Sequence, residues 1–206
     1  MSYPSQFRRK AFHPSFIGHG PSTAPVLIAS DTFNRANVAS PPGPTDGNGT
    51  EDPITPTAQA GTWGISTNQL FPFALAAGPL PARITWETHA ADITMNITLA
   101  TLDANGAGVL FRWVDASNYW LLLGSTSTLS LSKVVAGSST NVSGFIGVLG
   151  SGYTIQVTAN GSAISVVTNG NLIYSTSDST HATATKHGLQ SQGTSQRWDN
   201  LSFYTA

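Results

Sequence analysis

One short stretch of the chain combines charged and aromatic residues in a pattern that could bind a ligand. The segment GVLFRWVDASNYWLLL, residues 108–123, carries Arg112 and Asp115 among large apolar side chains. A two-residue period divides it into two strands around a turn rich in Asp, Ser and Asn. Pairing Asp115 with Asn118 places Arg112 and Tyr119 on one face. A guanidinium can donate forked hydrogen bonds to sugar hydroxyls or to a sugar acid, and a tyrosine ring can lie under a pyranose.

Both faces of this predicted hairpin are largely apolar, so we expect it near the centre of a β-sandwich. The face predicted to join the core carries Val109, Phe111, Trp113, Trp120 and Leu122. The opposite face carries Leu110, Arg112, Val114, Tyr119, Leu121 and Leu123. A charge on a mostly covered face needs a partner. The sequence leaves two interpretations of Arg112 open: it binds a glycan, or it pairs with Glu87 or another carboxylate and stabilises the sheet.

The acidic residues give no support to catalysis. A retaining glycosidase needs two carboxylates roughly 5–5.5 Å apart. The chain has only two glutamates, Glu51 and Glu87, and Asp92 follows Glu87 by five positions, which predicts opposite faces of one continuous strand. The five histidines are too scattered to assign a Ser–His–acid set. We therefore expect no catalytic residues and no enzymatic activity.

The loop TDGNGTED, residues 45–52, is a weak candidate for a cation site. It offers Asp46, Asn48, Glu51 and Asp52 as oxygen ligands, which calcium prefers. The spacing does not match an EF-hand, and Asn and Asp are also ordinary turn residues. We therefore predict no metal and no cofactor, with calcium as the alternative.

Composition narrows the class of protein. Only 9% of the 206 residues are charged and the net charge is −1, so neither nucleic acid nor a membrane surface is expected as a partner. The chain has no cysteine, which excludes disulfides and thiolate metal sites. No apolar run approaches the length that spans a membrane.

The pattern of strands and turns predicts an all-β fold. Strands follow one another at roughly 8–12 residues with no helical periodicity, which is typical of an antiparallel sandwich. The clearest signal is residues 153–177, three strands joined through Asn160-Gly161 and Asn169-Gly170. Residues 37–61, rich in proline and glycine, are predicted to form a long irregular loop.

The first 26 residues differ from the rest of the chain. They hold four prolines and three of the nine basic residues. Alone, such a segment cannot bury enough apolar area to offset its ordering entropy. We predict an extended arm over 1–26 that docks onto a partner chain, and a domain over 27–206. The predicted anchoring residues are Phe7, Arg8, Arg9, Lys10, Phe12 and Phe16.

The arm does not read as a signal peptide, because prolines and glycines interrupt the sequence after the basic residues. The composition nevertheless resembles that of exported proteins, with little Lys and Glu and much Thr, Ser and Asn. A bacteriophage virion protein is made in the host cytoplasm and acts outside it, which would explain both the exported-type composition and the lack of a signal-peptide pattern. A bacterial protein exported by a non-Sec route would do so as well.

Several motifs occur in an order that resembles a known superfamily. They are DTFNRA, GTWGI, GVLFRWVDASNYWLL, VTNGNLIYS and HGLQSQG followed by RWDNLSFY. Residues 30–206 are similar to the concanavalin A-like lectin/glucanase superfamily, and most to laminin-G-like domains appended to phage minor tail proteins. The resemblance implies a two-sheet antiparallel jelly roll whose last strand returns beside the first. It also implies a concave face, often glycan-binding, that would hold Arg112 and Tyr119, and a structural role for Arg197 and Asp199.

These inferences together predict a phage virion structural protein, either a minor tail or a decoration protein. Its arm would attach it to other virion proteins, and its jelly-roll domain would bind cell-surface glycans weakly. Because virion appendages are often cyclic oligomers, we expect a homo-oligomer and favour a trimer. The alternative is a free lectin-like carbohydrate-binding protein, which would have no need of the arm. A glycosidase is disfavoured by the scarcity of carboxylates.

Overall fold

The computed structural model describes residues 24–47, 53–77 and 81–206, and these form two antiparallel sheets with no helix among them. Sheet A contains β1 (Leu27–Asp31), β3 (Thr62–Ser66), β4 (Gln69–Ala74), β6 (Ile93–Thr101), β11 (Tyr153–Asn160), β12 (Ala163–Thr168), β13 (Asn171–Ser177) and β15 (Arg197–Thr205). Sheet B contains β2 (Thr57–Ala60), β5 (Ala82–Glu87), β7 (Ala107–Asp115), β8 (Asn118–Gly124), β9 (Leu129–Val135), β10 (Ser138–Asn141) and β14 (Lys186–Ser191). The predicted all-β sandwich is confirmed.

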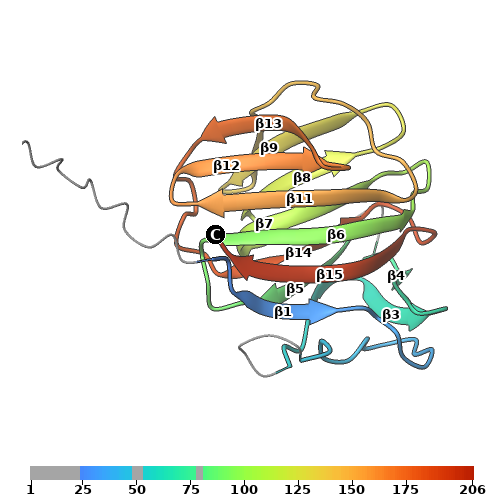
Figure 1. Cartoon of the computed structure of the whole chain (residues 1–206). Coiled ribbons are helices and arrows are strands. Elements are labelled where there is room, and N and C mark those ends of the chain that lie inside the picture. Colours follow the sequence, from blue (N-terminus) through green and yellow to red (C-terminus); the bar gives the residue numbers. More distant parts are fainter. Residues whose placement is uncertain (1–23, 48–52, 78–80) are drawn as a thin grey trace, which may run out of the picture.

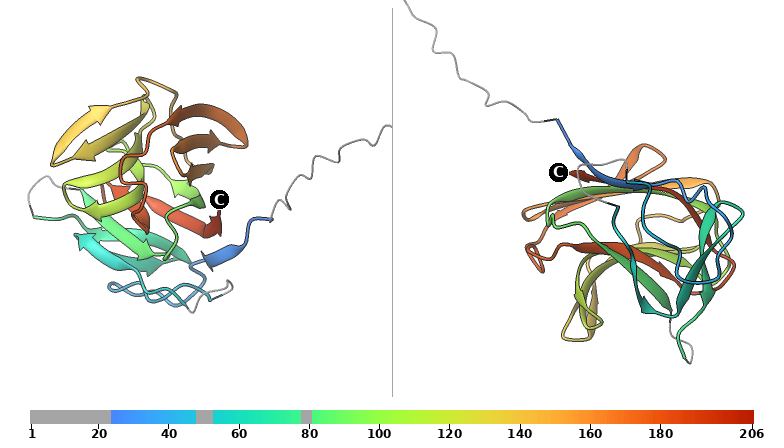
Figure 2. Two further views of the ribbon diagram at one scale, coloured as in Figure 1. Left: turned by 90° about the vertical axis from the view of Figure 1, so that its left-hand side faces the viewer. Right: turned by 90° about the horizontal axis from the view of Figure 1, so that it is seen from below.

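The two sheets lie one over the other as separate layers (Figures 1 and 2). Sheet A has the order β13-β12-β11-β6-β15-β4-β3, with β1 also paired to β15, and sheet B has the order β10-β9-β8-β7-β14-β5-β2. The predicted return of the last strand beside the first is confirmed, since Leu27 pairs with Tyr204. The amide of Thr205 also donates to the carbonyl of Val26 at 2.9 Å. Val26 therefore lies beside the C-terminus of the chain.

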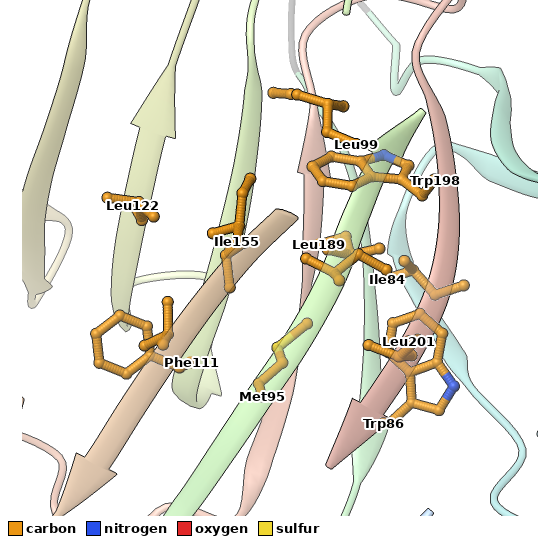
Figure 3. Packing of buried hydrophobic residues seen from close by; sticks show 14 of the residues in the cluster. Ile84, Trp86, Met95, Leu99, Phe111, Leu122, Ile155, Leu189, Trp198 and Leu201 are labelled. Atoms are coloured by element: carbon orange, nitrogen blue, oxygen red, sulfur yellow. The ribbon is translucent and has the colours of Figure 1, made fainter. Parts of the chain in front are cut away.

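The core between the sheets is built on large aromatic side chains. Trp63, Trp86, Trp120 and Trp198 are fully buried there. Figure 3 shows side chains from both sheets, Trp86 of β5 and Leu201 of β15 among them, directed into the same space. Burying each such side chain contributes roughly 1.5–3 kcal/mol. This core holds the two sheets at a fixed separation.

The two Asn-Gly turns predicted from the sequence are confirmed. Asn160-Gly161 joins β11 to β12 and Asn169-Gly170 joins β12 to β13, as predicted. Gly161, Asn169 and Gly170 have φ of 55°, 49° and 78°, the left-handed region that such tight turns need and that Gly and Asn tolerate. The loop predicted over 37–61 is less irregular than expected, because its proline-free end forms β2 and pairs with β5 at the edge of sheet B.

The central hairpin forms with the predicted turn but with one irregularity. Asp115 pairs with Asn118, and its carboxylate accepts hydrogen bonds from the Ser117 amide and the Asn118 side chain. The register between β7 and β8 shifts after Phe111, and Arg112 takes a φ of 50°. Three residues of β7, 112–114, face the single residue Tyr119 of β8 at this point, and the bulge interrupts the two-residue alternation of side chains. Arg112 and Trp113 therefore point to the faces opposite to those predicted.

His187 on β14 is buried close to this bulge. Its Nδ1 accepts the Arg112 amide at 3.3 Å, and its Nε2 lies 3.0 Å from the Ala90 carbonyl. A carbonyl can only accept, so Nε2 carries the proton and the ring is the neutral tautomer. Burial lowers the pKa of His187 to about 4, and the nearby charge of Arg112 acts in the same direction.

We predict that stability falls as the pH drops from 6.5 towards 4. In the unfolded chain His187 gains a proton near pH 6.5, whereas in the folded chain it resists protonation until about pH 4. The stabilisation is therefore fully present above pH 6.5, and up to about 3 kcal/mol is lost across this window. Urea unfolding at pH 7.5, 5.5 and 4 measures it.

His89 supplies the matched control, because its side chain is 73% exposed. His187→Gln should flatten the dependence of the unfolding free energy on pH between 6.5 and 4. His89→Gln should keep the slope of the parent protein. Equal slopes in the two variants would contradict the assignment to His187.

Candidate functional site

Arg112 does not lie on the outer face of the sandwich, so its predicted placement beside Tyr119 is wrong. Its side chain is fully buried. Nη2 donates to the Gly161 carbonyl at 2.6 Å and lies 3.5 Å from the Asp92 carboxylate. The physical reason is the bulge in β7, which turns Arg112 inward towards the turn between β11 and β12. Arg112 thus connects sheet B to sheet A, as the framework interpretation predicted, with Asp92 as the carboxylate.

Asp92 receives two contacts at this junction. Its Oδ1 accepts the Gly161 amide at 2.7 Å in addition to its contact with Arg112. Asp92 lies in the connection before β6, and Glu87 ends β5, so the two do not share one continuous strand as predicted. The Nε and Nη1 atoms of Arg112 are buried without a partner among the described residues.

Tyr119 lies on the outer face of sheet B, as predicted, but its ring is covered. It stacks on Trp113 with ring centroids 4.9 Å apart and an angle of 24°. Only 6% of Tyr119 and 3% of Trp113 are exposed. Both residues belong to a second apolar cluster on this outer face: Leu110, Trp113, Tyr119, Leu121 and Val134. A pyranose cannot stack on the Tyr119 ring in this arrangement, so that part of the sequence interpretation is wrong.

Arg83 on β5 takes the place that the sequence assigned to Arg112. Its Nε donates to Gln190 Oε1 on β14 at 2.8 Å, and its Nη2 donates to the Tyr119 hydroxyl on β8 at 2.8 Å. The guanidinium carbon lies 5.6 Å from the Trp113 ring centroid and 4.8 Å from that of Tyr119. Attraction to the electron-rich ring faces holds the cation on this aromatic pair.

One end of the Arg83 guanidinium remains free to bind. A guanidinium has five N–H donors, and the described residues accept only two of those on Arg83. Nη1 makes no hydrogen bond among these residues and is not among the buried unpartnered atoms, so it reaches solvent. The outer face of sheet B therefore presents a half-buried cation, fixed from three strands, with donors directed outward.

Side-chain alternation along β5 is a sequence signal that places Arg83 on the outer face. In β5 the side chains of Ile84 and Trp86 are buried in the core, so Arg83 and Thr85 alternate to the outer face. Thr85 is buried there and accepts a hydrogen bond at 2.9 Å from Gln59, whose exposed side chain forms the polar edge of this surface. That Arg83 meets Tyr119 depends on the order β8-β7-β14-β5, which is not local information.

Glu87 completes the charges on the outer face of β5. Its carboxylate accepts the His89 amide at 3.0 Å and lies 3.9 Å from His89 Nδ1. Partial burial raises the pKa of Glu87, but hydrogen bonds from Thr185 and His89 outweigh it and leave the pKa below its usual value. Glu87 is therefore ionised and already engaged at the end of its strand.

Of the candidate calcium residues, the structure describes Asp46 alone. Asp46 Oδ2 accepts the amide and hydroxyl of Thr32 at 2.8 and 2.7 Å, and its Oδ1 lies 3.4 Å from Arg35. Asn48, Glu51 and Asp52 lie outside the described residues, as do the arm residues Phe7, Arg8, Arg9, Lys10, Phe12 and Phe16. No group of three metal-ligating side chains occurs within residues 24–47, 53–77 and 81–206.

The outer face of sheet A carries a hollow of a different kind. Its volume is about 530 Å³, and its lining includes Asn96, Thr98, Thr154, Gln156 and Asn200, with no charged side chain. Gln156 donates to Asn96 at 2.8 Å across the pair β6–β11. The lining presents no fixed charge. Arg83 on sheet B therefore offers a ligand a charged anchor that this hollow lacks.

No protein-family model matches this chain, and no curated protein sequence matches it. Solved structures do share its fold. The carbohydrate-binding module CBM66 from Bacillus subtilis is 19% identical, with a TM-score of 0.54 over 73% of this chain and 91% of that chain. Domain 4 of AbnA, an extracellular arabinanase from Geobacillus stearothermophilus in complex with arabinotriose, is 13% identical, with a TM-score of 0.54 over 88% and 93%.

A third structure, reported for endo-acting O-glycanases of the human gut microbiota, is 7% identical, with a TM-score of 0.55 over 87% of this chain and 99% of that chain. At these identities the likeness shows the fold alone, a two-sheet antiparallel jelly roll. None of the described residues forms a helix long and apolar enough to cross a membrane.

Arg112 generates a prediction about stability. Arg112→Ala should lower the free energy of unfolding by about 3 kcal/mol or more, because it leaves a cavity between the sheets and removes the donor to Gly161 and Asp92. Arg112→Met should cost less, since it keeps most of the volume and removes the unpartnered donors. Thermal and urea unfolding measure both. An unchanged stability of Arg112→Ala would disprove the framework role.

Proposed function

We propose that this chain is a carbohydrate-binding jelly-roll domain that holds its glycan on the outer face of sheet B. One observation carries the proposal: the guanidinium of Arg83 is fixed by Gln190, Tyr119 and two aromatic rings, and still has free donors facing outward. Holding the side chain in place before binding reduces the entropy that a ligand must overcome.

The surroundings of Arg83 fit a shallow sugar site. Sugar hydroxyls accept hydrogen bonds from guanidinium donors, and the exposed Gln59 adds a further amide group at the edge of the face. The fold is one that CBM66 and the arabinotriose-bound domain of AbnA also have, which supports a binding role. In this proposal Tyr119 positions Arg83 and does not stack on the sugar.

The proposed setting is a phage virion, with the domain as a minor tail or decoration protein. This part of the proposal rests on the sequence: the basic, proline-rich segment over 1–26 and the order of motifs in the domain. Millimolar affinity, about −4 kcal/mol, would suffice for each site, because many copies on one particle bind together. A free lectin-like protein is the alternative.

Glycan binding should depend on Arg83 and not on arginine in general. On a glycan array with the full-length chain, Arg83→Met should reduce binding at least about tenfold, because a charge-assisted hydrogen bond contributes roughly 1.5–3 kcal/mol. Arg197→Met is the matched control, since Arg197 also lies over an aromatic ring, 4.6 Å from the Phe71 centroid, but at another site. A parent protein that binds no glycan would refute the proposed function.

The arm generates a separate prediction. Because Val26 pairs with Thr205, the truncation should remove only residues 1–23. The shortened protein should keep the thermal unfolding transition of the full chain and should no longer be incorporated into phage particles. Truncated protein that still copurifies with particles would contradict the anchoring role of the arm.

A further inference from the structure

We propose that the glycan bound by sheet B carries a carboxylate and that Arg83 is the group that pairs with it. This inference rests on the proposed function and deepens it by naming the substrate class, an acidic sugar such as a uronic or sialic acid. Its basis is the difference between Arg83 and the other fixed cations of the sandwich.

Three other buried or half-buried cations in the described part of the chain have carboxylate partners. Arg35 contacts Asp31 at 2.6 Å, and Lys133 contacts Asp178 at 2.6 Å. The fully buried Arg112 has Asp92 at 3.5 Å. In each case an acidic side chain of the protein itself compensates the charge.

Arg83 is held differently. Among the described residues no carboxylate lies within 4 Å of it, and its two acceptors, Gln190 Oε1 and the Tyr119 hydroxyl, are neutral. Glu87 points to the same face of β5, but it is four residues away, roughly 13 Å along the strand, and is engaged by His89. The cation is therefore fixed in place and its charge is not neutralised.

Arg197 shows that the lack of a carboxylate partner does not by itself indicate a ligand site. It too has no carboxylate within 4 Å in the part of the chain described, but its Nη1 donates to the Thr194 and Gln196 carbonyls, three and one residues before it. These bonds close a local turn. Arg83 in contrast receives its partners from two other strands, β8 and β14, which hold the guanidinium against the sheet.

The free end of the Arg83 guanidinium suits a carboxylate. Nε and one N–H of Nη2 donate to Gln190 and to the Tyr119 hydroxyl. The N–H donors of Nη1 and the second N–H of Nη2 are left without a partner among the described residues. Two parallel N–H donors match the two oxygens of a carboxylate, and such charge-assisted bonds are about twice as strong as neutral ones. A sugar acid would supply the counter-charge that the described surface lacks, whereas a neutral sugar would offer only hydroxyls.

The experiment compares acidic sugars with matched neutral ones on the full-length chain. Trigalacturonate and 3′-sialyllactose are each paired with their own methyl ester, so that the members of each pair differ only in the charged group. Isothermal titration calorimetry at 50 and 300 mM NaCl should show roughly 10- to 100-fold tighter binding of at least one acidic member. That preference should shrink at the higher salt concentration, as an ion pair requires.

Variants assign the preference to Arg83. Arg83→Met should abolish the difference between the acidic and neutral sugars, and Arg83→Lys should retain part of it, because lysine keeps the charge and loses the fork. Arg197→Met should leave the preference unchanged, which excludes a general effect of positive charge. The thermal unfolding transition of each variant confirms that the sandwich is intact at the assay temperature.

The outcomes separate this inference from the proposed function. Equal binding of both members of each pair, or glycan-array binding confined to neutral sugars, would overturn the acidic preference and leave a carbohydrate-binding domain. An acidic preference that survives in Arg83→Met would also overturn it. If the parent protein binds neither these sugars nor any array glycan, both the inference and the proposed function are wrong.

Discussion

The arrangement of both faces of sheet B depends on the bulge in β7. Without it, strict alternation would place Arg112 on the outer face and Trp113 in the core. With the bulge, Phe111 and Arg112 both point inward, and Trp113 joins Tyr119 outside. Arg112 can then reach the turn between β11 and β12 in sheet A and connect the two sheets at that end of the sandwich.

The same bulge also creates the surface that carries Arg83. Trp113 can stack on Tyr119 only because it has been turned to the outer face, and this stack is the support on which the Arg83 guanidinium lies. Covering both rings removes them as direct sugar-stacking platforms. Their contribution is instead to fix a cation that would otherwise sample many rotamers. The framework and the candidate site therefore share one structural cause.

Features that depend on neighbouring residues agree with the sequence prediction better than features that depend on how the strands pair. Turns such as Asn160-Gly161 depend on neighbouring residues and on backbone conformations that few residue types adopt, so the sequence predicts them well. The faces of the central hairpin were predicted correctly for Phe111, Trp120 and Leu122 and wrongly for Arg112 and Trp113. Alternation holds until the bulge, and no residue type in this stretch marks the bulge in advance, since a non-glycine residue adopts the positive φ.

Arg83 could not be assigned from the sequence for a second reason. Its alternation on β5 is visible in the sequence. Its partners, however, lie 36 and 107 residues away, and their meeting depends on the strand order of the whole sheet.

In a chain with only nine Lys and Arg residues, the partners of each cation indicate its role. Three of the cations described above face carboxylates and stabilise the sandwich, whereas Arg83 faces neutral groups within the described residues. On the opposite outer face, the hollow of sheet A is lined by amides and hydroxyls with no charged side chain. Among the described residues, the hollow of sheet A has a neutral lining, whereas the outer face of sheet B presents at Arg83 a fixed cation that a ligand can neutralise.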